Sequence, residues 1–142
     1  MNLKKITENE MDLITSNIKL MSLEKILFFN ALEELFKNIV YKTKEECFLN
    51  AFKKNTRDEA IQSVLNTKIK ISNKEIKHFI HVNTINQNLF FLTKQQMYNK
   101  LLKSIEKVIS ETKNKCKEEI LKQSEFFKYT NKYAIKLLKI YE

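Results

Sequence analysis

The chain has neither glycine nor proline among its 142 residues. Glycine permits the positive φ angles of tight hairpin turns, and proline is the strongest helix breaker, so a chain that lacks both favours helices over hairpins. The missing glycine also excludes glycine-rich phosphate loops, the dinucleotide-binding fingerprint and the nucleophile elbow. We therefore predict an all-α helical bundle, with residues 1–142 forming a single domain.

Six Ser or Thr residues are followed three positions later by Glu or Gln, the spacing of a capping box at a helix start. In a capping box each side chain bonds a backbone N–H that the first turn leaves unpaired. Repeated pairs of this kind predict a chain with several helix starts. The pairs are Thr7/Glu10, Thr43/Glu46, Thr56/Glu59, Ser72/Glu75, Thr84/Gln87 and Thr93/Gln96.

Apolar residues recur at three- and four-residue steps, which is the pattern of helices with one buried face. The segment from Ser22 to about Ile39 has the broadest apolar face, so we place the centre of the core there. Residues 67–71 alternate and predict a short strand or an extended connector, and residues 84–88 predict a polar loop. The other predicted helices run from Thr7 to about Leu20 and, more briefly, after Thr43, Thr56 and Ser72.

The helical pattern continues from Thr93 to the last residue, Glu142. A single helix over this span would be about 75 Å long, which exceeds the diameter of a compact domain of this size. The helix therefore either breaks or projects towards a partner. Residues 111–119 contain only one apolar residue, Cys116, so we expect a break or an exposed stretch there.

The net charge of +9 is uneven along the chain. Residues 1–66 carry ten basic and ten acidic side chains, so the whole excess lies in residues 67–142. AT-rich codon usage would favour lysine in both halves alike, so the asymmetry indicates a basic face with a function. Arg57 is the only arginine, and this argues against sequence-specific DNA recognition while leaving lysine contacts to a phosphate backbone.

The C-terminal segment is a predicted basic amphipathic helix, with its lysines within an 80° arc opposite an apolar face. A second lysine stripe with i, i+3, i+7 spacing precedes it. The lysines could form a solvated bundle face, follow an RNA or DNA backbone with tyrosines for stacking, or dock on an acidic protein or anionic membrane surface. The candidate binding residues are Lys100, Lys103, Lys107, Lys128, Lys132, Lys136, Lys139, Tyr129 and Tyr133.

No catalytic arrangement is evident. Glu75, His78 and His81 have the spacing to hold zinc with a water, but we favour two half-exposed histidines on a surface helix. A di-iron bundle would need a second Glu-x-x-His segment, which the chain lacks. Cys47 and Cys116 lie where a helix places core residues, so we interpret them as small buried side chains. We expect no enzyme activity, no metal and no cofactor.

These observations predict a non-catalytic helical subunit or accessory factor of a larger assembly, with its lysine-rich C-terminal face against nucleic acid. The alternative is a protein-directed interaction module, such as an inhibitor, immunity or scaffold protein, that does not contact nucleic acid. A weaker third hypothesis is a metal-dependent enzyme. The longest apolar runs have four residues, so we expect no transmembrane span, no signal peptide and a cytoplasmic or similarly reducing location. No motif identifies a family.

Overall fold

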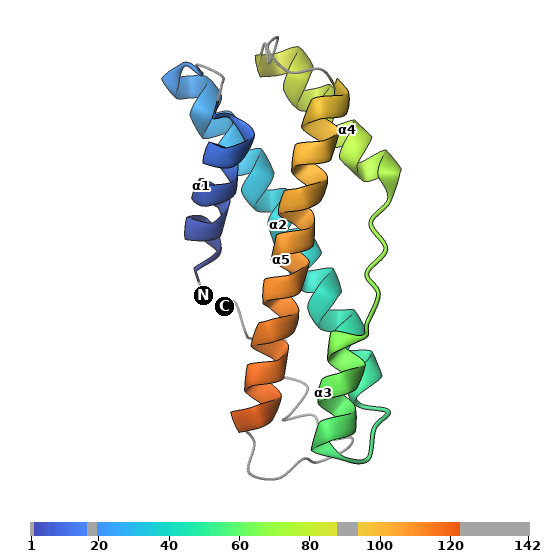
Figure 1. Ribbon diagram of the computed structural model, residues 1–142. Coiled ribbons are helices and arrows are strands. Elements are labelled where there is room, and N and C mark those ends of the chain that lie inside the picture. Colours follow the sequence, from blue (N-terminus) through green and yellow to red (C-terminus); the bar gives the residue numbers. More distant parts are fainter. Residues whose placement is uncertain (1, 17–19, 88–93, 123–142) are drawn as a thin grey trace. The chain divides into compact units, whose positions relative to one another are not determined.

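The computed structural model describes residues 2–16, 20–87 and 94–122, and within these ranges it contains five α-helices and no strand (Figure 1). The prediction of an all-α helical bundle with a long helix towards the C-terminus is confirmed. No helix in the described ranges has the length and apolarity that crossing a membrane requires. The helices are α1 Leu3–Ile14, α2 Ser22–Ala51, α3 Arg57–Leu65, α4 Asn73–Gln87 and α5 Lys94–Lys122.

The chain divides into two compact units, and the long helices α2 and α5 contribute residues to both. Among the described residues, unit 1 consists of Asn38–Ile69 and residues 108–122. Unit 2 consists of Asn2–Lys37 and Lys70–Lys107. Each unit therefore combines segments from the charge-neutral and the basic halves of the sequence.

Unit 2 has a core of large apolar side chains from all four of its helical segments. Phe28 of α2 is fully buried and meets Phe79 of α4 edge to face, with ring centroids 6.1 Å apart. This geometry is the favoured one for aromatic pairs. The apolar stripe predicted after Ser22 supplies the centre of this core from Phe28 onwards, whereas its first members, Leu23 and Leu27, are exposed. The other buried members are Ile14, Leu32, Phe36, Ile76, Ile80, Met97, Leu101 and Ile105.

Unit 1 has a smaller core, in which α3 packs against the C-terminal parts of α2 and α5. Short side chains dominate it, and the rings of Phe48 and Phe52, with centroids 4.1 Å apart, are partly buried at its edge. The buried members of this cluster are Cys47, Ala51, Ala60, Ile61, Val64, Cys116 and Ile120.

Two of the six predicted helix starts are confirmed. Thr56 is the N-cap of α3, and its hydroxyl accepts a hydrogen bond from the backbone N–H of Glu59 at 3.2 Å. The Ser72 hydroxyl accepts one from the N–H of Lys74 at 3.2 Å, where α4 begins. Thr93 lies outside the described residues, next to the start of α5 at Lys94.

Three other predicted starts were wrong because the residues lie inside helices. The buried hydroxyls of Thr7 and Thr43 donate hydrogen bonds to the carbonyl groups of Leu3 at 2.8 Å and Ile39 at 2.7 Å. Within a helix, a buried threonine hydroxyl can thus donate to the carbonyl group four residues earlier, and the helix continues past the threonine. Thr84 likewise lies within α4, and the loop predicted over residues 84–88 is helical as far as Gln87.

The expected break in the last described helix does not occur, since α5 continues through residues 111–119 to Lys122. Thr112 and Cys116 lie one turn apart and are both fully buried, so they continue the inward face despite the charged residues around them. The Thr112 hydroxyl bonds the carbonyl of Val108 at 2.7 Å. Residues 67–71 form a connector without a strand, which is one of the two predicted outcomes.

Candidate functional site

The three lysines of the upstream stripe have different surroundings in unit 2. Lys100 donates a hydrogen bond to the carbonyl of Ile14, the last residue of α1, at 3.3 Å. Lys107 forms an ion pair with Glu10 at 3.3 Å. Both lysines thus tie α5 to α1, and a cation near the last carbonyls of a helix is favourable. Lys103 is exposed to solvent, and its assignment as a binding residue stays a prediction.

The other candidate binding residues belong to the C-terminal segment. Lys128, Tyr129, Lys132, Tyr133, Lys136 and Lys139 lie outside the described residues. Their assignment as binding residues therefore stays a prediction from the sequence.

The structure adds a basic face on α4 that the lysine stripes did not indicate. Lys74, Lys77, His78 and His81 are all exposed, and at 100° per residue they fall within one 100° arc of the helix. Glu75 is the only acidic residue of α4 and lies beyond one edge of that arc. These four residues are called the α4 basic face below. It presents side chains that suit an anionic partner.

A groove lies between this face and the first turns of α5 in unit 2. It has a volume of about 320 Å³ and is lined by Lys77, Ile80, His81, Gln95 and Tyr98. The phenol of Tyr98 donates a 2.6 Å hydrogen bond to the side-chain carbonyl oxygen of Asn73, and this contact holds the ring at the groove. We refer to it as the α4–α5 groove. It combines a cation, an aromatic ring and an amide in one place.

The positions of the two histidines do not support a zinc site. His78 and His81 are exposed on α4, as expected for histidines on a surface helix. Within the described residues, no group of three or more His, Cys, Asp or Glu side chains is placed to hold a metal ion. Glu75 is exposed as well, so the three side chains do not form a buried site.

The two cysteines lie in the same buried cluster of unit 1, although nothing in the sequence places them together. Both are free and fully buried, as predicted for structural cysteines. A hydrogen bond from Cys116 lowers the pKa of the Cys47 thiol, and the positive charge of Lys113 acts in the same direction. The same contact, together with burial, raises the pKa of Cys116 far above its usual range.

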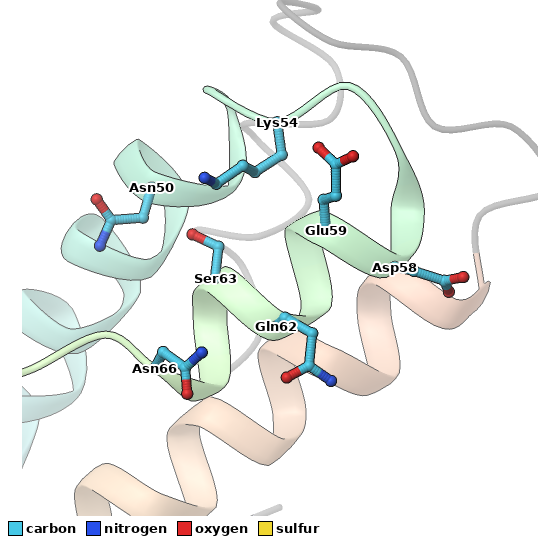
Figure 2. Close-up of a pocket in the computed structure, with 7 residues that line it drawn as sticks. All are labelled: Asn50, Lys54, Asp58, Glu59, Gln62, Ser63 and Asn66. Carbon is cyan, nitrogen blue, oxygen red and sulfur yellow. The ribbon is translucent and has the colours of Figure 1, made fainter.

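A second groove, of about 560 Å³, separates the end of α2 from α3 in unit 1 (Figure 2). Figure 2 shows Asn50 and Lys54 on the α2 side and Glu59 and Ser63 on the α3 side. The lining combines one cation with two carboxylates and has no aromatic ring. It therefore offers neither the charge nor the flat apolar surface that a nucleic acid would need. Its residues are Asn50, Lys54, Asp58, Glu59, Gln62, Ser63 and Asn66.

The α4 basic face was within reach of the sequence, because a helical projection of residues 73–87 groups its members. The position of Tyr98 and Gln95 beside α4 could not be predicted from the sequence, since it depends on how two helices pack. Comparison with protein-family models, with curated proteins and with solved structures finds no significant match.

Proposed function

We propose that this protein is a non-catalytic helical subunit or accessory factor of a larger assembly, and that its lysine-rich half lies against the backbone of a nucleic acid. The α4 basic face carries this proposal. It exposes four basic side chains over two turns of helix, and it belongs to the half of the sequence that supplies the entire net charge of +9.

The basic half of the sequence also contains exposed Lys103 and the lysines of the C-terminal segment. Lysine ammonium groups bind phosphates as point charges, which gives affinity without base selection. With Arg57 as the only arginine, bidentate reading of base edges plays little part. The expected binding is therefore independent of sequence and weakens steeply with salt.

Charge reversal tests the proposal. A double variant, Lys74→Glu with Lys77→Glu, removes two cations from the α4 basic face. A triple variant, Lys128→Glu with Lys132→Glu and Lys136→Glu, does the same in the C-terminal segment. Binding of labelled RNA and DNA is measured at about 50 and about 200 mM salt, a range over which phosphate contacts lose most of their strength.

Each lost phosphate contact should reduce the slope of log K against log salt by roughly one. The matched control is Lys4→Glu with Lys5→Glu, which makes the same charge change on exposed residues of α1. The proposal predicts a much larger loss for the α4 variant than for this control, with unchanged helicity by circular dichroism. Equal affinity for the wild type, the double variant and the triple variant would overturn it.

One observation favours the alternative, a protein-directed module without nucleic-acid contact. Five large apolar side chains within residues 13–27 of unit 2 are exposed, and exposed apolar surface is what a protein partner would cover. This alternative predicts no nucleic-acid affinity even at low salt. It also predicts a stoichiometric complex that Leu23→Glu with Ile26→Glu abolishes. The exposed residues are Leu13 at 55%, Met21 at 74%, Leu23 at 66%, Ile26 at 57% and Leu27 at 48%.

A further inference from the structure

We infer that the α4–α5 groove holds one nucleotide of a single-stranded nucleic acid, with its base on the ring of Tyr98 and its phosphate at Lys77 and His81. The inference rests on the proposed function and deepens it, because it assigns a stacking contact and a preference for single strands. The C-terminal segment plays no part in it.

The spacing of the lining residues makes two opposing walls. Lys77 and His81 are one turn apart on α4, and Gln95 and Tyr98 are three residues apart on α5. Residues at these spacings share one side of a helix. The α4 wall is thus basic, and the α5 wall carries the ring and the amide. The volume of about 320 Å³ lies at the small end of the range for ligand sites.

The α5 wall suits the flat face of a base. Aromatic side chains stack on every base, so this contact contributes affinity without selecting a sequence. The 2.6 Å hydrogen bond from Tyr98 to Asn73 joins the end of the ring to the first residue of α4. The ring is thereby held in position before a ligand arrives, which reduces the entropy cost of binding.

The remaining lining residues complement the other parts of a nucleotide. Ile80 is only 3% exposed and adds apolar surface beside the ring. The Gln95 amide nitrogen donates a 3.1 Å hydrogen bond to the side-chain oxygen of Asn99. Its second N–H and its carbonyl oxygen can bond the edge of more than one base. Lys77 and His81 belong to the α4 basic face, which continues to Lys74 and His78. A strand that leaves the groove therefore meets the ammonium group of Lys74 and the imidazole of His78.

The groove favours single strands because a duplex hides the faces of its bases. Stacking on a protein ring requires an unpaired base. The phosphate contacts of the proposed function serve single and double strands alike, whereas the Tyr98 contact serves only single strands. This difference allows the inference to be tested separately from the proposed function.

The experiment uses the full chain and labelled single-stranded and duplex oligonucleotides, with 2-aminopurine in some single strands as a reporter of stacking. Tyr98→Leu removes the ring. Tyr98→Phe is the matched control, which keeps the ring and loses only the hydroxyl contact to Asn73. Thermal unfolding of both variants shows whether the fold of the chain is retained.

We expect Tyr98→Leu to weaken single-strand binding about tenfold or more, to leave the salt slope and duplex binding unchanged, and to abolish quenching of 2-aminopurine. Tyr98→Phe should stay within about threefold of the wild type. Lys77→Gln should instead reduce the salt slope by roughly one for both ligands.

If Tyr98→Leu binds single strands as tightly as the wild type does, the groove assignment is overturned and the proposed function is unaffected. A wild type that binds no nucleic acid at low salt overturns both. If Tyr98→Leu lowers the unfolding temperature more than Tyr98→Phe does, ultraviolet crosslinking of the wild type decides the matter. A crosslinked peptide containing Tyr98 supports the inference, and crosslinks confined to other peptides contradict it.

Discussion

The ammonium group of Lys113, on α5, donates a hydrogen bond to the backbone carbonyl of Leu65, the last residue of α3, at 3.4 Å. The same group bonds the carbonyl of Thr67, two residues further on. The final carbonyls of a helix lack partners within it, and a cation there also complements the helix dipole. One side chain thus fixes the end of α3 and the start of the following connector within unit 1.

Replacement of Lys113 by Met should therefore destabilise unit 1. Met keeps the aliphatic stem and the helix propensity but removes the donor, so we expect a loss of about 1–3 kcal/mol in the free energy of unfolding. Lys103→Met makes the same change at an exposed site of the same helix and should alter it by less than about 0.5 kcal/mol. Urea titration of both variants measures the difference, and equal midpoints would contradict this role of Lys113.

The buried stripe of α2 predicts a second contrast. Leu32 is fully buried in the core of unit 2, whereas Leu27 is 48% exposed. Leu32→Ala should cost about 2–5 kcal/mol because it leaves a cavity as well as losing apolar contact. Leu27→Ala should change stability by about 1 kcal/mol or less. Thermal unfolding that ranks the two variants in the opposite order would show that the core of unit 2 is placed incorrectly.

The thiol pair predicts how stability depends on pH. Two thiols in contact within one buried site cannot both ionise, because the two thiolates would repel each other. In the unfolded chain both thiols ionise above about pH 8.5. Cys116 has a raised pKa in the fold, so its contribution is present below about pH 8.5 and is lost as pH rises above it. Cys47 has a lowered pKa, so it acts in the opposite sense, by adding stability as pH rises from its folded pKa towards about 8.5.

Above about pH 8.5 the unfolded chain therefore holds fewer thiol protons than the folded chain, and the free energy of unfolding should fall. Denaturant titrations at a series of pH values measure this slope. The control replaces both Cys47 and Cys116 by Ala. It should be less stable at neutral pH because of the cavity, and its stability should not fall between about pH 8 and 9.5. The same slope in both proteins would contradict the thiol assignment.

The divided lysine stripe predicts different outcomes for neighbouring residues. Lys103→Gln removes an exposed cation and should reduce the salt slope of nucleic-acid binding by roughly one. Lys107→Gln removes the ion pair with Glu10. The lysine side chain is 56% exposed but the Glu10 side chain only 8%, so the loss of the cation beside this buried carboxylate should cost about 1–3 kcal/mol of stability. Lys107→Gln should also change the salt slope less than Lys103→Gln does. A larger effect of Lys107 on the slope would mean that the ion pair opens on binding.

Much of the fold follows from local rules that a sequence displays. The apolar steps after Ser22 locate the core of unit 2, and the Thr56/Glu59 pair marks the start of α3. The same rule failed at Thr7 and Thr43, because a buried threonine can bond the carbonyl four residues back as well as cap a helix. The two cases look alike in a sequence and differ only in burial.

The site depended more on contacts between helices. Lys100 and Lys107 look equivalent to Lys103 on a helical projection, yet α1 engages two of the three. Tyr98 and Gln95 line a groove only because α4 packs beside them. Cys47 likewise meets Cys116 only through the packing of α2 against α5. Periodicity predicts which face of a helix is buried, but it does not predict which helix covers that face.

The most direct test of the account is a titration of labelled single- and double-stranded RNA and DNA with the wild-type chain at low and at moderate salt. We predict binding tighter than micromolar at low salt, a steep loss of affinity with added salt, and little dependence on base sequence. Absence of binding to all four ligands at low salt would contradict the account. The charge of +9 would then reflect codon usage and solubility, and the search would turn to a protein partner for the exposed apolar residues of unit 2.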